Sequence, residues 1–135
     1  MVQPTHTFPY RFIDESKFPR PYIPVTLRSQ KRMMQPLLAL VDSGADFYLF
    51  DGELSYLLDI DLTKLEKMSL SGVAGAAEGY IAHIEIGVED TFFPVPVDFW
   101  FDFSPKGFGG VIGQIGFFDT FIVQFDRASK TVVLK

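Results

Sequence analysis

A single acid at the end of an apolar run is the feature that most constrains this chain. Residues 37–50 read LLALVDSGADFYLF, so an apolar run leads into Asp42, a Ser-Gly-Ala turn and a second mostly apolar run. A carboxylate in hydrophobic surroundings is costly unless it has a partner or takes part in chemistry. The run 37–41 predicts a strand that is buried on both faces and that ends at this acid.

Alternation of apolar and polar residues predicts strands along most of the remaining chain. They are expected near residues 23–27, 47–50, 80–88, 92–101, 111–113, 121–125 and 131–134. Pro94 and Pro96 place the strand that contains them at a sheet edge or at a bend. Helix is predicted only in short pieces after Asp51 and over 114–120. This spacing predicts a mostly β fold, either a barrel or a sandwich.

The N-terminal segment differs from the rest of the chain because prolines recur in it, with aromatic residues between them. Such prolines prevent a helix and favour an extended arm. We expect the rings of this arm to pack on their own domain rather than on a second copy. The chain is therefore divided into a proline- and aromatic-rich arm, residues 1–21, and one domain over residues 22–135.

Composition excludes several classes of function. The net charge of −5 disfavours non-specific binding to nucleic acid or to an anionic membrane. No apolar run approaches the ~20 residues that span a bilayer, and no signal-peptide pattern is visible. The absence of cysteine excludes disulfides and thiolate catalysis, and is consistent with the cytoplasmic location that we expect.

Sequence motifs for other chemistries are missing. The glycines fit neither nucleotide-binding loop pattern, and Ser43 lacks the surrounding glycines of a nucleophile elbow. The two histidines, His6 and His83, are too few for a zinc site, and His83 is expected on the exposed face of its strand. No metal and no cofactor are expected.

Three segments together resemble the retropepsin-like aspartic proteases. LVDSGA at 40–45 matches the family pattern of an apolar pair, Asp, Thr or Ser, Gly, and Ala or Ser. The glycine-rich segment 72–79 looks like the mobile flap, and VIG at 111–113 looks like the triplet beneath the active site. The resemblance covers about residues 22–135. It implies a closed acid-protease β-barrel with a flap hairpin and one or two short helices.

The resemblance also implies roles for individual residues. Asp42 matches the catalytic aspartate of an aspartic endopeptidase, with Ser43, Gly44 and Gly113 as active-site support. The implied substrate-binding residues are Ala45, Asp46, Val73, Ala74, Gly75 and Ala76. Asp46 has an equally simple interpretation as a turn-capping acid. Gln114 stands where viral members have an arginine that pairs with the acid matched by Asp46, so that pairing is expected to be weaker or different.

This chemistry requires two carboxylates that share one proton, because like charges so close cannot both ionise. The chain has only one Asp followed by Ser or Thr and then Gly. We therefore predict a homodimer in which Asp42 of each chain meets its copy at a two-fold axis. A peptide or protein substrate would bind beneath both flaps like an added strand.

Two alternatives remain open at this stage. The same barrel can serve as a non-catalytic peptide-binding or assembly module in which Asp42 is a relic. The chain can also be a monomer whose Asp-Ser-Gly-Ala segment is only a buried, hydrogen-bonded turn.

Overall fold

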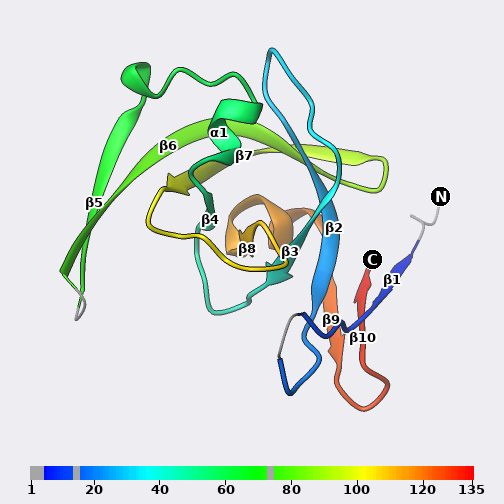
Figure 1. Ribbon diagram of the computed structural model, residues 1–135. Coiled ribbons are helices and arrows are strands. Elements are labelled where there is room, and N and C mark those ends of the chain that lie inside the picture. Colours follow the sequence, from blue (N-terminus) through cyan, green and yellow to red (C-terminus); the bar gives the residue numbers. More distant parts are fainter. Residues whose placement is uncertain (1–4, 14–15, 73–74) are drawn as a thin grey trace.

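The computed structural model describes residues 5–13, 16–72 and 75–135, which are mostly β-structure (Figure 1). The strands are β1 (His6–Pro9), β2 (Tyr22–Arg28), β3 (Leu37–Val41), β4 (Tyr48–Asp51), β5 (Glu66–Gly72), β6 (Gly75–Val88), β7 (Thr91–Trp100), β8 (Gly110–Ile112), β9 (Val123–Asp126) and β10 (Thr131–Leu134). The short helical elements are α1 (Leu54–Leu57), η1 (Leu62–Lys64) and η2 (Gln114–Phe118).

Six strands close into a mixed barrel. The strand order is β2-β3-β8-β4-β7-β6-β5, and an additional pairing of β2 with β6 closes the ring. The pairs β3–β8 and β4–β7 are parallel, whereas the other pairs are antiparallel. The closed, mostly β barrel with short helices that the sequence predicted is therefore confirmed.

The two faces of the barrel sheet differ sharply in burial. One row of paired residues forms the core, with every member at most 3% exposed: Val41, Ile112, Tyr48, Val97 and Ala82. The neighbouring row has side chains on the opposite face, and we call it the outer row: Leu40, Val111, Leu49, Asp98 and Ile81. Apart from Asp98, its members are partly exposed.

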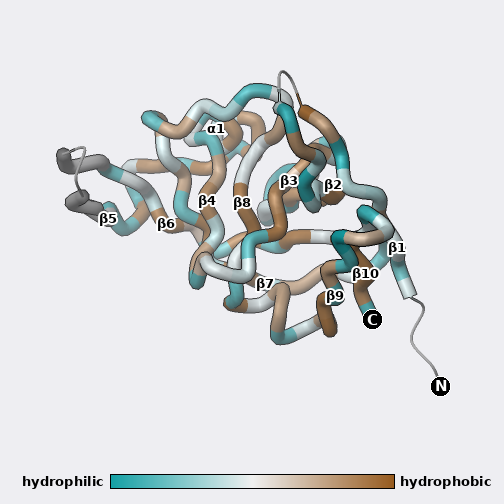
Figure 2. The backbone as a smooth tube through the Cα atoms, turned by 90° about the horizontal axis from the view of Figure 1, so that it is seen from below, coloured by the Kyte–Doolittle hydropathy of each residue, from teal (hydrophilic) through white to brown (hydrophobic). Residues whose placement is uncertain are grey.

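The outer row corrects one prediction. The strand over 37–41 was expected to be buried on both faces, but Leu40 is partly exposed while Ala39 and Val41 are buried. A continuous apolar run does not distinguish a core face from a face that lines a cleft. Figure 2 shows that the segments of β3, β4 and β8 at the middle of the molecule are nonetheless mostly hydrophobic.

The flap hairpin consists of β5 and β6. These strands pair from Glu66 opposite Ile81 to Gly72 opposite Gly75, so strand structure continues through most of the predicted glycine-rich loop. Of the predicted flap residues, Val73 and Ala74 lie outside the described residues. In Figure 1 the described part of this hairpin extends beyond the barrel on the left of the view.

The prolines of β7 lie where that strand has a neighbour on one side only. Pro94 and Pro96 pair with β6, but the pairing with β4 begins at Val97. Proline lacks the N–H that a second neighbouring strand would need. The prediction of a sheet edge at these prolines is therefore confirmed locally, although β7 is central further along.

A second, smaller sheet in the order β1-β10-β9 joins the two ends of the chain (Figure 1). The predicted closing hairpin is present as β9 and β10. β1, from the proline-rich segment, pairs with β10, and Phe8 is buried there, whereas Phe12 and Phe18 are exposed. Among the described residues, no helix has the length and apolar character needed to cross a membrane.

Candidate active site

Asp42 directly follows β3 and remains in register with the sheet. Its backbone N–H donates to the Ile112 carbonyl at 3.0 Å, which extends the parallel pairing of β3 with β8 by one residue. Since side chains alternate along a strand, Asp42 shares a face with Leu40, two residues earlier. The acid therefore lies on the partly exposed face, and it is itself half-buried.

The turn after Asp42 orients its carboxylate. The Gly44 N–H donates to Asp42 Oδ1 at 2.9 Å, and the Ala45 N–H donates to the Asp42 carbonyl at 3.2 Å. A hydrogen bond from a backbone N–H to an ionised oxygen is stronger than a neutral one. One carboxylate oxygen is thus held by the turn, while the side chain keeps part of its surface open to solvent.

Gly113 allows the segment after β8 to approach this turn closely. A Cβ atom at Gly113 would overlap the Phe47 carbonyl oxygen and would lie 2.8 Å from the Ala45 carbonyl oxygen. Only glycine permits such an approach of two backbones. The next residues hold the turn in place, because the N–H of Gln114 donates to the Ala45 carbonyl and that of Ile115 donates to the Asp46 carbonyl.

The Gln114 side chain contacts the turn backbone rather than an acid. Its Nε2 donates to the Ser43 carbonyl at 2.6 Å. The Asp46 and Ser43 side chains are exposed, and within the described part of the chain neither side chain forms a hydrogen bond. Within the described residues Gln114 therefore does not pair with Asp46. It supports the turn through the Ser43 carbonyl instead.

A hollow of about 300 Å³ opens beside Asp42. It is lined by Arg20, Pro21, Leu40, Val41, Asp42, Ser43 and Phe125. Large apolar side chains are exposed nearby: Phe125 by 39%, Ile115 by 41% and Phe47 by 54%. Exposed apolar surface around an oriented acid is suited to contact with an apolar ligand or with another protein chain.

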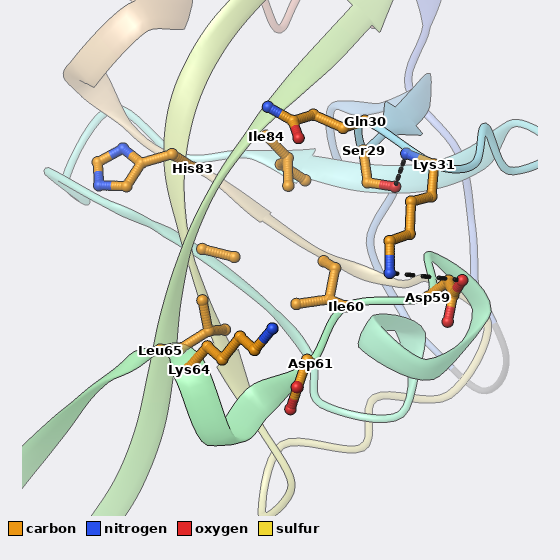
Figure 3. Close-up of a pocket in the computed structure, with 11 residues that line it drawn as sticks. Ser29, Gln30, Lys31, Asp59, Ile60, Asp61, Lys64, Leu65, His83 and Ile84 are labelled. Carbon is orange, nitrogen blue, oxygen red and sulfur yellow. Dashed lines mark hydrogen bonds and ion pairs between the residues drawn. The ribbon is translucent and has the colours of Figure 1, made fainter.

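Figure 3 shows a second hollow, of about 280 Å³, that shares no residue with the Asp42 turn. Its acids already have partners: Asp59 lies 4.0 Å from the Lys31 ammonium, and Asp61 accepts hydrogen bonds from the Thr63 backbone and hydroxyl. Those bonds from Thr63 lower the pKa of Asp61. His83 is exposed, as predicted, and its ring points away from the other labelled side chains. This hollow offers no free acid for catalysis.

The structure brings most of the predicted site residues together. Contacts within and around one turn join Asp42, Ser43, Gly44, Ala45, Asp46 and Gly113. The predicted flap residues Gly75 and Ala76 lie instead at the start of β6, opposite Gly72 and Ser71. Across residues 5–13, 16–72 and 75–135, no group of three or more His, Asp or Glu side chains is arranged to hold a metal ion.

One acid on the same face was not singled out from the sequence. Asp98, in β7, is only 7% exposed, and its Oδ2 accepts a hydrogen bond from Trp100 Nε1 at 2.9 Å. Burial raises the pKa of Asp98, and the Trp100 hydrogen bond partly opposes that rise. A signal was available, because Asp98 is the one charged residue in the ten-residue segment 91–100.

The barrel and its acid-bearing turn define a class of fold, that of the retropepsin-like aspartic proteases, and solved structures match it. A retropepsin-like aspartic protease from Rickettsia conorii aligns with a TM-score of 0.66 and 16% identity, covering 99% of this chain and 96% of that one. The EIAV protease in complex with an inhibitor aligns with a TM-score of 0.54 and 19% identity, covering 76% of this chain and 88% of that one.

These matches show that the chain has the retropepsin-like fold that the sequence predicted. No protein-family model matches the sequence, and no curated protein is a significant match.

Proposed function

We propose that this chain is an aspartic endopeptidase that hydrolyses peptide bonds with two Asp42 carboxylates, one from each chain of a homodimer. The observation that carries the proposal is the position of Asp42. It follows β3 on the partly exposed face, its Oδ1 is held by the Gly44 N–H, and the barrel around it has the fold of aspartic proteases.

Among the described residues of the outer row, no acid lies close enough to Asp42 to be its partner in this chemistry. The other acid of the outer face, Asp98, is separated from the Leu40 position by three strand-to-strand steps, through Val111 and Leu49. At ~4.8 Å per step Asp98 lies about 14 Å from Leu40 along the sheet, and Asp42 lies two residues beyond Leu40, so the two carboxylates are too far apart to share a proton. A second copy of Asp42 is the partner that the chemistry requires.

Features of the surface support a homodimer. Ile122 is 71% exposed and Phe125 is 39% exposed, and both lie in or beside β9, the last strand in the order β1-β10-β9. An edge strand with exposed apolar side chains readily pairs with another chain. Because Phe125 also lines the hollow beside Asp42, a copy that covers β9 would close the side of the site as well.

In the proposed reaction the two Asp42 carboxylates share one proton. The ionised one removes a proton from a water molecule, whose oxygen bonds to the carbonyl carbon, while the protonated one donates its proton to the carbonyl oxygen and a gem-diol forms. The gem-diol then returns one hydroxyl proton to the ionised carboxylate as the C–N bond breaks, and the leaving amine takes its proton from the protonated carboxyl, so the pair again holds one proton. The substrate would lie extended between the turn residues Ala45 and Asp46 and the flap residues 73–76, held by backbone hydrogen bonds.

The direct test is the Asp42→Asn variant, assayed by mass spectrometry on a mixture of peptides. We expect cleavage to fall by about a thousandfold or more, since a general acid–base pair is lost. Asp90→Asn, at an exposed acid in the turn between β6 and β7, is the matched control and should cleave as the wild type does.

Circular dichroism and sedimentation would confirm that both variants keep the fold and the dimer. Cleavage that persists in Asp42→Asn would contradict the proposal. Peptide binding by the wild type without any cleavage would support the non-catalytic peptide-binding module instead.

A further inference from the structure

Asp98 occupies a place in the outer row that suits recognition of a ligand. The row runs from Leu40 through Val111 and Leu49 to Asp98 and Ile81, and Asp42 lies on the same face two residues after Leu40. An extended chain that crosses these strands from Asp42 reaches Asp98 in roughly four to five residues, at about 3.4 Å per residue. The other members of the row are apolar, so Asp98 is its only charged member.

The two oxygens of this carboxylate differ. Oδ2 accepts a hydrogen bond from Trp100 Nε1, whereas Oδ1 is buried and has no partner among the described residues. A buried carboxylate oxygen without a donor is unfavourable, and a donor supplied by a ligand would remove that cost. The fold makes room for Oδ1, because a Cβ at Gly79 would overlap both this oxygen and the Trp100 indole.

A small hollow of about 50 Å³ lies against the Asp98 side chain. It is lined by Phe47, Ile81, Pro96 and Asp98, so its walls are apolar and its one charged group is the carboxylate. Phe47 belongs to the segment that follows the Asp42 turn, and it is 54% exposed. The hollow is therefore linked to the candidate active site in two ways. Phe47 belongs to both, and Asp98 lies in the same row of paired residues as Leu40.

We propose that Asp98 forms a specificity subsite that selects a lysine side chain of the substrate. The apolar walls suit the aliphatic stem of lysine, and the ammonium group would donate to Oδ1 and pair with its charge. A lysine ammonium is compact, which fits so small a hollow better than a planar guanidinium does. This inference rests on the proposed function, because it names a residue class that the peptidase would prefer.

The test uses a positional-scanning library of octapeptides in which each position is fixed in turn as lysine, norleucine or glutamine. Norleucine keeps the aliphatic stem and removes the ammonium group. At one position within four residues of the cleaved bond, we expect the wild type to favour lysine about tenfold in kcat/KM, which is about 1.4 kcal/mol. Asp98→Asn should abolish this preference.

Glu85→Gln is the matched control, because Glu85 is an acid of β6 that pairs with Arg28 instead. This variant should keep the preference for lysine. A preference that Glu85→Gln removes and Asp98→Asn leaves intact would overturn the assignment. A preference for glutamine over both lysine and norleucine would also overturn it, since the subsite would then select a neutral donor.

Binding measured by calorimetry separates the subsite from the peptidase. In the Asp42→Asn chain, the preferred lysine octapeptide should bind about tenfold more tightly than its norleucine counterpart, and Asp98→Asn in the same chain should remove the difference. Cleavage without a lysine preference would overturn the subsite and leave the proposed function standing. A lysine preference in binding without any cleavage by the wild type would support the subsite and overturn the proposed function.

Discussion

Asp42 and Asp98 lie on the same face of one barrel but in opposite surroundings. Asp42 follows the last residue of a strand, is half-buried, and has Oδ1 held by a backbone N–H. Asp98 lies within a strand, is almost fully buried, and has Oδ2 held by an indole. In the proposed function the turn therefore presents Asp42 to reactants, whereas the sheet holds Asp98 against an apolar hollow where it would recognise one side chain.

The largest expected effect comes from disturbing the backbone contacts that hold the Asp42 turn, which Asp98 does not share. Gly113→Ala places a methyl group against the Phe47 and Ala45 carbonyl oxygens, so the turn must move. We expect a loss of about 1–3 kcal/mol in the free energy of unfolding, measured with urea, and a large loss of peptide cleavage.

Gly44→Ala is the milder companion of that variant, because its Cβ would lie 3.3 Å from Asp42 Oδ1 and meets no backbone atom within the described residues. It should destabilise the chain less than Gly113→Ala. Equal stability of Gly113→Ala and the wild type would contradict the view that this close approach builds the site.

The Gln114 side chain should have a smaller effect. Gln114→Ala removes the hydrogen bond from Nε2 to the Ser43 carbonyl, so we expect a loss of about 0.5–1.5 kcal/mol in unfolding free energy. Peptide cleavage should fall several-fold because the turn is less firmly held. Gln30→Ala, at an exposed loop position, is the control and should leave both quantities unchanged.

The smallest effect concerns Asp98 and its dependence on pH. Burial raises the pKa of Asp98 in the folded chain above its ordinary value of 3.8, so the folded chain holds this proton more tightly than the unfolded chain. The contribution of Asp98 to stability is therefore greatest below about pH 3.8 and falls as the pH rises through the raised pKa.

Asp98→Asn keeps an acceptor for Trp100 and cannot ionise. In urea unfolding at equal protein concentration, this variant should therefore be more stable than the wild type at about pH 7, and the difference should vanish near pH 3. A variant that is less stable at about pH 7 and regains stability at low pH would show that the folded chain prefers the ionised acid.

Much of the barrel was predictable because strands carry a period of two. The predicted alternation matches the burial of β6 from Ala82 to Ile86, whereas Tyr80 is partly exposed and Gly87 is buried. The turn at Asp42 was predictable for a different reason, since a short motif and an apolar strand together fix which residue emerges at the end of β3. Gly113 was predicted as active-site support from the separate segment VIG at 111–113, but its close approach to the Phe47 and Ala45 carbonyl oxygens was not predicted.

Other features depended on contacts that no local pattern contains. The partly exposed face of β3 and the buried face have equally apolar residues, so the prediction of burial on both sides was wrong. Trp100 is a local neighbour of Asp98 in β7, but Phe47 and Ile81 lie beside Asp98 only when β4, β6 and β7 are assembled. For β7 the sequence analysis used Pro94 and Pro96 to predict a sheet edge, and it did not single out Asp98, the one acid of that strand.

In the proposed peptidase each active site needs one Asp42 from each of two chains, and mixed dimers test this requirement directly. Wild-type and Asp42→Asn chains would be unfolded together, refolded at a fixed total concentration, and assayed as the wild-type fraction is varied. We predict that activity follows the square of that fraction, so an equal mixture keeps about one quarter of the wild-type activity. Activity that is directly proportional to the wild-type fraction would contradict the claim, because each chain would then act alone.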